Sequence, residues 1–323
     1  MRKIEEKSTK ILITGAGGQI GRVLSSTLAE QYGQNAVVIS DLADKGYGGL
    51  TYEQLNVLDR ARMEKIVERH GITQIYHLAA LLSATGEKDI HLTWDINFNG
   101  FINVLEVAKK HSLQRIFFPS SIAVYGSDFD KANTPQNAFR NADTMYGISK
   151  VAGESWANYY WKKYGMDIRS IRYPGIIGHQ SMPGGGTTDY AVDIFHQAIQ
   201  HGEYNCFLQA DARLPMIYME DAIRATIELM QADPDQLTIH TSYNLQGMSF
   251  TPEELASEIK NDLPHFQMTY QPDYRQQIAE KWPQKMDDSA ARNDWNWKPK
   301  FDLTHMTKDM IKHLSKKYKE QHV

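Results

Sequence analysis

The first 125 residues alternate between short apolar runs and longer stretches in which apolar residues recur every three or four positions. The stretches with helical period predict helices over residues 20–33, 62–71 and 98–112. The apolar runs predict strands over residues 10–18, where the strand runs into a glycine turn, and over 35–41, 74–80 and 115–121. Short apolar strands separated by amphipathic helices are typical of a parallel sheet covered on both faces. We therefore expect an α/β fold, a doubly wound parallel sheet whose ligands bind at the carboxyl ends of its strands.

This alternation ends in the second half of the chain, where the pattern is less regular. The sequence "TPEEL" predicts a helix there, with Thr251 as its cap, Pro252 at its first position and Glu254 completing a capping box. The chain is long enough for one large domain or two modest ones. We expect residues 1–175 to form the nucleotide-binding part, with some later segments returning to it. Residues 176–323 are expected to form mainly a smaller C-terminal lobe that binds substrate.

Composition excludes several classes of partner. The formal net charge of the 323 residues is −4, which gives no reason to expect nucleic acid or an anionic membrane surface as a partner. No apolar run approaches the roughly 18 residues of a membrane span, and the N-terminal "MRKIEEKSTK" lacks the apolar core of a signal peptide. The single cysteine, Cys206, allows no disulfide within the chain. A cytoplasmic location is therefore expected.

The glycine turn after the first strand predicts a dinucleotide site. "GAGGQIG" places Gly15, Gly18 and Gly21 at regular spacing between a strand and a helix, with Gln19 and Ile20 among them. Glycines at these places permit a tight turn and a close approach to a pyrophosphate, which then lies on the helix N-terminus. Asp41 ends the second predicted strand. An acid there accepts hydrogen bonds from the adenosine ribose and repels a 2′-phosphate, which favours NAD over NADP; the alternative is that Asp41 only caps a helix.

A tyrosine and a lysine further along the chain indicate alcohol chemistry. Tyr146 and Lys150 in "YGISK" are four residues apart and share one face of a helix. A nearby ammonium lowers the pKa of a phenol, and a phenolate is a suitable base for an alcohol whose carbon loses hydride. A hydroxyl of Ser120 or Ser121, at the end of the fourth predicted strand, is positioned to orient the same substrate oxygen. The alternative is an ordinary aromatic helix position followed by a solvated lysine.

These motifs together resemble the extended short-chain dehydrogenases/reductases, whose nucleotide-binding domain is a Rossmann fold. The resemblance covers nearly the whole chain and rests on "GAGGQIG", "HLAA", "NFNGFINVLE", "PSSIAVYG", "YGISK" and "RYPGIIG". It implies that Tyr146 is the acid/base, that Lys150 binds the nicotinamide ribose and that Ser121 helps to hold the substrate. Asn56 stands where the family often has Asp beside the adenine. The further cofactor contacts that the resemblance implies are Asn56, Leu78, Ala79, Ala80, Asn97, Ser120, Tyr173 and Ile176.

Within that family, two long blocks resemble one group, the short-chain-type L-threonine 3-dehydrogenases. The blocks are "PGGGTTDYAVDIF", from Pro183 to Phe195, and the segment from Glu280 to Pro299. The resemblance implies oxidation of L-threonine to 2-amino-3-oxobutanoate with NAD, and functional coupling to a 2-amino-3-ketobutyrate CoA ligase. Two alternatives stay open: a nucleotide-sugar epimerase or dehydratase of the same fold, and a non-catalytic NAD-sensing protein. Nucleotide-sugar members commonly have Asn where this chain has Pro174, and a sensor would need no Tyr/Lys pair.

The glycine–threonine block suits a small zwitterion such as threonine. Backbone N–H groups in a glycine run can form an anion-binding concavity, and two threonine hydroxyls follow them. Asp189 would meet the ammonium or brace the loop; alternatively, Thr188 or Asp189 only caps the following helix. Trp282 is expected either to close over the substrate or to be a buried aromatic of the lobe. The substrate contacts predicted besides Ser121 and Tyr146 are Ser83, Gly186, Thr187, Thr188 and Trp282.

Two further expectations concern metals and assembly. The twelve histidines show no metal-ligand spacing, so no metal is predicted. The helices that begin near Asp95 and Tyr146 carry more aromatic surface than a monomer obviously covers, at Phe101, Trp156, Tyr159 and Tyr160. In the resembling family these two helices often form a four-helix bundle between two subunits, which implies a homodimer with isologous packing.

Overall fold

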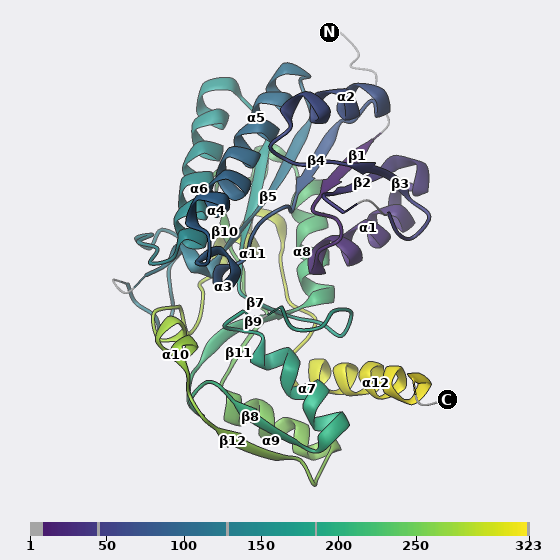
Figure 1. Cartoon of the computed structure of the whole chain (residues 1–323). Helices are drawn as coiled ribbons and strands as arrows, with labels where there is room; N and C mark the ends of the chain where they lie inside the picture. The colour runs from purple at the N-terminus through teal and green to yellow at the C-terminus, as the bar shows by residue number, and fades with distance from the viewer. Residues whose placement is uncertain (1–8, 44–45, 127–128, 185, 322–323) are drawn as a thin grey trace.

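The computed structural model describes residues 9–43, 46–126, 129–184 and 186–321 (Figure 1). The charged N-terminal stretch considered for a signal peptide lies almost wholly outside these residues. Within them, no helix combines the length and the apolar character that a membrane-spanning helix requires.

Seven parallel strands form the central sheet, in the order β10-β6-β5-β4-β1-β2-β3. This order contains the 3-2-1-4-5-6 arrangement of doubly wound dinucleotide-binding folds, and the predicted fold class is confirmed. The pattern missed β3 because that strand lies at the edge of the sheet and buries only Glu53 of its four residues. The strands are β1 (Ile11–Thr14), β2 (Val37–Asp41), β3 (Thr51–Gln54), β4 (Gln74–His77), β5 (Arg115–Ser121), β6 (Ile168–Tyr173) and β10 (Tyr243–Asn244).

Helices cover both faces of this sheet, as its apolar strands require. Successive residues of β1 point to opposite faces: Ile11 and Ile13 pack in one core cluster and Leu12 packs in another. The first face is covered by α1 (Gln19–Tyr32), α8 (Met219–Gln231) and α11 (Ser289–Trp295). The second face is covered by α2 (Arg60–His70), α5 (Gly100–Lys110) and α6 (Met145–Tyr164), as Figure 1 shows. A short helix α4 (Ile90–Trp94) and a π-helical turn (Asp95–Asn99) lead into α5.

Segments from the second half of the chain complete the sheet. β10 pairs in parallel with β6, with Tyr243 opposite Ile171. α8 packs on β6 and on α1, and α11 packs beside β10. The central sheet is therefore built from residues on both sides of position 175.

The remaining elements form the smaller C-terminal part, which packs around a third core cluster. The capping box predicted at Thr251 is confirmed, with Pro252 at the first position of α9 and reciprocal bonds between Thr251 and Glu254. The strands are β7 (Gly175–Ile177), β9 (Leu214–Tyr218) and β11 (Met248–Phe250) in one small sheet, and β8 (Glu203–Cys206) and β12 (Gln267–Tyr270) in another. The helices are α7 (Tyr190–His201), α9 (Pro252–Asp262), α10 (Tyr274–Ala279) and α12 (Leu303–Gln321).

Candidate active site

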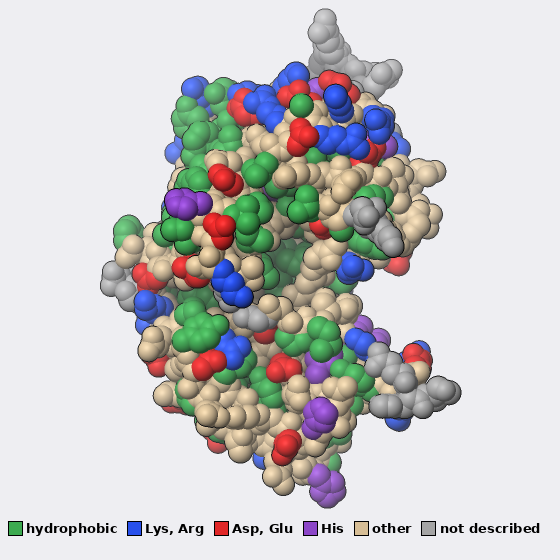
Figure 2. Space-filling view, viewed as in Figure 1, with side chains coloured by type: hydrophobic (Ala, Val, Ile, Leu, Met, Phe, Trp, Pro, Cys, Tyr) green, Lys and Arg blue, Asp and Glu red, His purple; other side chains and the backbone are tan. Residues whose placement is uncertain are grey.

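A pocket lies at the carboxyl ends of the central strands, where they meet the C-terminal part. Figure 2 shows this face of the molecule hollowed between the two parts. The turn after β1, the ends of β4, β5 and β6, the loop before α7 and Trp282 all line the pocket. It brings together these predicted residues: Gly15, Gly18, Gln19, Ile20, Gly21, Leu78, Ala80, Ser83, Ser120, Ser121, Tyr146, Lys150, Tyr173, Ile176, Gly186, Thr187, Thr188 and Trp282.

The turn between β1 and α1 requires glycine at two positions. Gly15 has a φ of +68°, and a Cβ there would lie 2.5 Å from the backbone nitrogen of Ala79. A Cβ at Gly21 would lie 2.5 Å from the carbonyl oxygen of Ala16. At the start of α1, Gly18 is the cap and provides no side chain to the first helical N–H groups. The helix therefore presents its positive end to the pocket, which suits a pyrophosphate.

Asp41 is held against this turn by its own hydrogen bonds. Its Oδ2 accepts the backbone N–H of Gly17 at 2.8 Å, and its Oδ1 accepts the N–H of Leu42 at 2.7 Å. Asp41 is the last residue of β2 and caps no helix of the described chain, so the capping alternative is wrong. Its carboxylate stands at the carboxyl edge of the sheet beside the glycine turn, where a ribose-binding acid belongs.

Tyr146 and Ser121 form the polar pair at the centre of the pocket. Tyr146 lies in the first turn of α6, which Thr144 caps, and Ser121 is the last residue of β5. The two hydroxyls are joined by a hydrogen bond. The neighbouring Ser120 also lines the pocket, but its hydroxyl donates to Glu154 Oε1 at 2.6 Å. Of the two serines, Ser121 therefore has the hydroxyl that faces Tyr146.

Lys150 lies one turn further along α6 and is 3% exposed. Its ammonium is 5.4 Å from the ring centroid of Tyr146 and 4.8 Å from that of Phe118. Within the described part of the chain it has no hydrogen-bond partner. A buried ammonium without a partner lacks the interactions that water would give it, which suits a group that binds a ligand hydroxyl.

Burial controls the protonation of both groups. It raises the pKa of the Tyr146 phenol to about 12, against the smaller lowering effect of the hydrogen bond with Ser121. It lowers the pKa of the Lys150 ammonium to about 7. Burial outweighs the favourable interactions around the Tyr146 phenol, and the lowering of its pKa by Lys150 stays a prediction.

The loop before α7 is braced by Asp189. Its Oδ2 accepts the backbone N–H groups of Gly184 at 2.7 Å and Gly186 at 2.8 Å. These two amides are therefore not free to bind a substrate carboxylate, which corrects that expectation for Gly186. Asp189 occupies the cap position of α7, but its side chain makes no capping bond. The loop points its two threonines at the pocket, and Thr187 is 3% exposed.

The pattern of the NAD dependent epimerase/dehydratase family matches residues 11–245. The chain belongs to this family. The match includes the glycine turn, the Ser121–Tyr146–Lys150 cluster and β10. NAD is accordingly the cofactor of this epimerase/dehydratase-family chain, and the glycine turn, the open start of α1, Asp41 and the unpaired Lys150 ammonium are the features of the pocket that fit it.

Several similar proteins carry a more specific name than the family does, L-threonine dehydrogenase. The mitochondrial L-threonine 3-dehydrogenase of Bos taurus is 44% identical over 95% of this chain and 83% of its own length. The solved L-threonine dehydrogenase of Cupriavidus necator, in its holo form, is 53% identical with a TM-score of 0.93 and covers 94% of this chain and 99% of its own. A monomeric L-threonine 3-dehydrogenase of metagenomic origin, in its apo form, is 48% identical with a TM-score of 0.92. The match covers 95% of this chain and 99% of that one.

Four of the predicted cofactor residues do not line the pocket of this family member. Asp41 stands behind the glycine turn, and Ala79 packs against Gly15. Asn97 is buried and braces the segment after β4, because its amide bonds the N–H of Leu81 at 2.8 Å and the carbonyl of Leu81 at 3.0 Å. Asn56 is exposed and accepts the N–H of Leu58 at 3.0 Å. Its contact with the adenine stays a prediction.

Sequence reasoning missed two sets of residues around the pocket. One set consists of apolar or backbone neighbours of the predicted residues, and only their adjacency in the chain signals them: Leu82, Pro119, Ile122, Pro174 and Gly175. The other set is a polar network that contacts Ser120; Tyr125 and Arg172 lie in the quoted motifs "PSSIAVYG" and "RYPGIIG", but no role was assigned to them from the sequence. Its members are Glu154, Arg172, Tyr125, Asn244 and Arg140.

Proposed function

We propose that this protein oxidises the β-hydroxyl of L-threonine to give 2-amino-3-oxobutanoate, with NAD as the hydride acceptor. The observation that carries the proposal is the meeting, in one pocket, of the Ser121–Tyr146 pair with the loop that presents Thr187 and Thr188. The first pair suits a secondary alcohol. The second suits the polar amino-acid end of a small substrate. The relatives named L-threonine dehydrogenases support this combination at 44–53% identity.

The reaction assigns a distinct task to each side chain. Ser121 and Tyr146 bind the substrate hydroxyl, and Tyr146 takes its proton as the carbon gives up hydride. When bound, NAD supplies the nicotinamide ring that accepts this hydride. Lys150 holds the nicotinamide ribose, and its positive charge, when present, favours the phenolate form of Tyr146. Asp41 binds the adenosine ribose and excludes a 2′-phosphate.

The substrate end of the pocket is built from hydroxyls and an aromatic wall. Thr187, Thr188 and Ser83 are the hydroxyl groups that we assign to the carboxylate and ammonium of threonine. Asp189 acts through the backbone by holding the loop that carries the two threonines. Trp282 is 8% exposed, packs in the core of the C-terminal part and lines the pocket. We assign it to the wall against the small side chain.

The decisive experiment measures NADH formation with purified protein and L-threonine, with UDP-glucose as the comparison substrate and Tyr146→Phe as the comparison protein. We expect turnover with L-threonine alone, and a loss of ~10²–10⁴-fold in Tyr146→Phe with NAD binding retained. Nucleotide-sugar epimerases and dehydratases regenerate NAD and release no NADH, so conversion of UDP-glucose is followed by analysis of the sugar product. Conversion of UDP-glucose and not of L-threonine would assign the epimerase or dehydratase alternative. NAD binding with no turnover of either would assign the sensor.

We also propose a homodimer formed through α6 and the helix that begins at Asp95 and continues as α5. Phe101 and Tyr160 are covered within the monomer, which corrects that part of the sequence argument. Trp156 and Tyr159 are 38% and 47% exposed, and Ile148 on the same helix is 43% exposed. Light scattering at micromolar concentration tests the proposal, with Trp156→Lys as the disrupting variant. A monomer in the unmodified protein would contradict it, and one relative is described as monomeric.

Two consequences of the proposed activity complete the assignment. We place the protein in the cytoplasm. We also place it before an enzyme that consumes 2-amino-3-oxobutanoate, a 2-amino-3-ketobutyrate CoA ligase. The product is a β-keto acid, which otherwise decarboxylates to aminoacetone. Assaying the coupled pair for glycine formation tests this link, and accumulation of aminoacetone alone would contradict it.

A further inference from the structure

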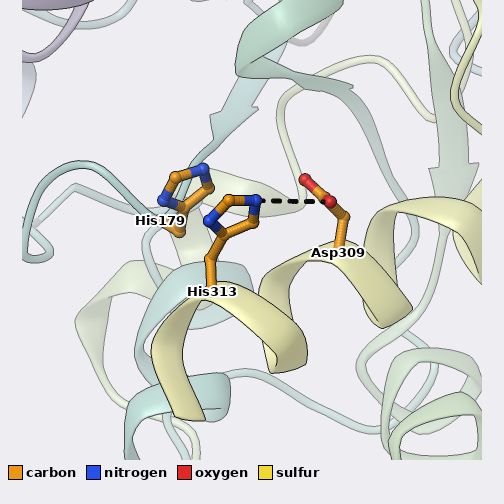
Figure 3. A group of neighbouring side chains, drawn as sticks. All are labelled: His179, Asp309 and His313. Carbon is orange, nitrogen blue, oxygen red and sulfur yellow. Dashed lines mark ion pairs between the residues drawn. The ribbon is translucent and has the colours of Figure 1, made fainter. Parts of the chain in front are cut away.

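Two histidines and an aspartate from distant parts of the chain meet outside the active site (Figure 3). His179 lies in the loop just after β7, and Asp309 and His313 lie one turn apart on α12. One ligand atom from each of the three residues lies within 4.8 Å of the other two. None of these side chains takes part in the chemistry proposed above.

The surroundings of this cluster are rich in negative charge. Glu220, at the start of α8, places its Oε1 3.7 Å from His179 Nε2. Asp309 places its Oδ1 3.5 Å from His313 Nε2. In the part of the chain that the structure describes, neither carboxylate forms an ion pair with a lysine or arginine. With neutral imidazoles, the four side chains carry a charge of about −2.

Each carboxylate also keeps one oxygen available. The Tyr218 hydroxyl donates to Asp309 Oδ2 at 2.7 Å, which leaves Oδ1 on the side of the histidines. Gln180 donates to Glu220 Oε1 at 3.0 Å. Glu220 Oε2 is buried and, among the described residues, has no hydrogen-bond partner. A buried carboxylate oxygen without a donor is costly unless a cation or a water completes it.

We propose that His179, His313 and Asp309 bind a divalent transition-metal ion of the Zn²⁺ class. Two imidazoles and one carboxylate are ligands that Zn²⁺ accepts, and three protein ligands leave a fourth position for water. Glu220 is then an outer carboxylate that orients His179, as carboxylates beside metal-bound histidines commonly do. The hard-oxygen cations Mg²⁺ and Ca²⁺ fit this set poorly, because they prefer sites made of oxygen ligands.

Binding requires one imidazole to rotate. The two rings are stacked, with centroids 4.0 Å apart and planes 7° apart, so their in-plane lone pairs run parallel and do not converge on one point. His313 has 43% of its side chain accessible, and we infer that it is the ring that turns when the ion binds.

The position of the site connects it to the substrate loop. The chain runs from His179 to the pocket residue Gly186 in seven steps, and Asp309 and His313 lie on α12, which packs on α7 behind this loop. A metal that joins His179 to α12 would restrain both ends of the segment that carries Thr187 and Thr188.

Metal binding is tested directly by equilibrium dialysis of untagged protein with Zn²⁺, and by visible absorption after loading with Co²⁺. We expect one ion per chain and a raised midpoint of thermal unfolding with metal, because an ion that binds only the folded state stabilises it. His313→Asn and His179→Asn are each expected to weaken binding by at least ~10-fold, since even outer-shell changes commonly cost this much.

His305→Asn is the matched control on the same helix. His305 is exposed and pairs with Asp302 one turn away, at 2.7 Å, and it belongs to no cluster of possible metal ligands among the described residues. It should bind Zn²⁺ as the unmodified protein does. Unchanged unfolding midpoints without metal show that the variants fold. Equal loss of binding in His305→Asn and His313→Asn, or no saturable binding in the unmodified protein, would overturn the proposal.

Discussion

Glu154 and Arg172 form a buried ion pair directly behind the active site, with Arg172 Nε 2.9 Å from Glu154 Oε1 and Arg172 Nη2 2.9 Å from Oε2. The same Oε1 accepts the hydroxyl of Ser120, whose neighbour Ser121 meets Tyr146. Arg172 also donates to Asn244 of β10. The pair thus joins β5, which carries Ser120 and Ser121, to α6, which carries Tyr146, and to β10 at the edge of the sheet.

Breaking this pair should be strongly destabilising. Glu154→Gln leaves the Arg172 guanidinium buried without its counter-charge, which typically costs about 3–5 kcal/mol. Urea unfolding measures the loss, and the exposed Glu30→Gln on α1 is the control with no expected effect. At permissive temperature the turnover of Glu154→Gln should also fall, because Ser120 and Ser121 lose their support. A variant as stable as the control would show that the pair does not hold the fold.

The rate of L-threonine oxidation should rise with pH. Burial raises the pKa of Tyr146 to about 12, so at neutral pH the phenol holds its proton and cannot yet accept the one from the substrate. Raising the pH increases the fraction of phenolate and therefore kcat/KM. A profile of log(kcat/KM) measured from about pH 6 to about pH 10, the range that approaches the ordinary pKa of tyrosine, checks this prediction. A flat or falling profile would contradict a tyrosine base.

Lys150→Met should make the protein more stable and inactive. The ammonium of Lys150 is buried and forms no hydrogen bond among the described residues, and removing it should raise the free energy of unfolding by ~1–3 kcal/mol. The pKa of Lys150 is lowered to about 7, so the unfolded chain binds more protons between that pH and the ordinary lysine pKa. Stability of the unmodified protein therefore rises with pH across this window, and the advantage of Lys150→Met is largest at and below pH ~7. Lys162→Met, exposed on the same helix, should change neither property.

Cofactor preference should depend on Asp41. Asp41→Ala removes both the ribose acceptor and the acceptor of the Gly17 N–H, so NAD should bind more weakly and the gap to NADP should narrow. Asp41→Asn retains an acceptor oxygen for Gly17 and loses only the charge. The Asn variant therefore separates the charge of Asp41 from its hydrogen bond to Gly17. If the difference in affinity between NAD and NADP narrows in both variants, repulsion of the 2′-phosphate by the charge sets the cofactor preference. Equal use of NAD and NADP by the unmodified enzyme would refute the role of Asp41.

The loop before α7 should respond differently at its two polar positions. Thr187→Ala should lose ~1–3 kcal/mol of substrate binding or transition-state stabilisation, as for a deleted buried hydrogen bond, and Thr187→Ser much less. Asp189→Ala frees the N–H groups of Gly184 and Gly186, so it should loosen the loop and raise KM more than it lowers kcat. Steady-state kinetics with L-threonine checks both. Identical behaviour of Thr187→Ala and Thr187→Ser would assign the methyl group, and not the hydroxyl, to the site.

The pattern of the chain predicts four strands of the central sheet and misses the other three. β1, β2, β4 and β5 are apolar on both faces and were predicted. β6 is fully buried but was missed because Arg169, Ser170 and Arg172 interrupt its apolar residues. β3 is half-exposed, and β10 has only two residues, too few for a pattern. Motif spacing located Tyr146, Lys150 and the glycine turn because each chemistry needs those residues at short range. It did not reveal that Asp189 uses the glycine amides, nor the Glu154–Arg172 pair, because these contacts depend on how distant segments meet in space.

The return of β10 to the edge of the central sheet also constrains how the protein is made. During synthesis β6 leaves the ribosome long before Tyr243 and Asn244, which pair with its residues Ile171 and Arg172. Until they arrive, the outer edge of β6 stays unpaired, and until α8 and α11 follow, one face of the sheet stays partly uncovered. Such edges and faces are where nascent chains associate wrongly. The N-terminal part therefore cannot finish folding as an independent unit, and its completion waits for nearly the whole chain.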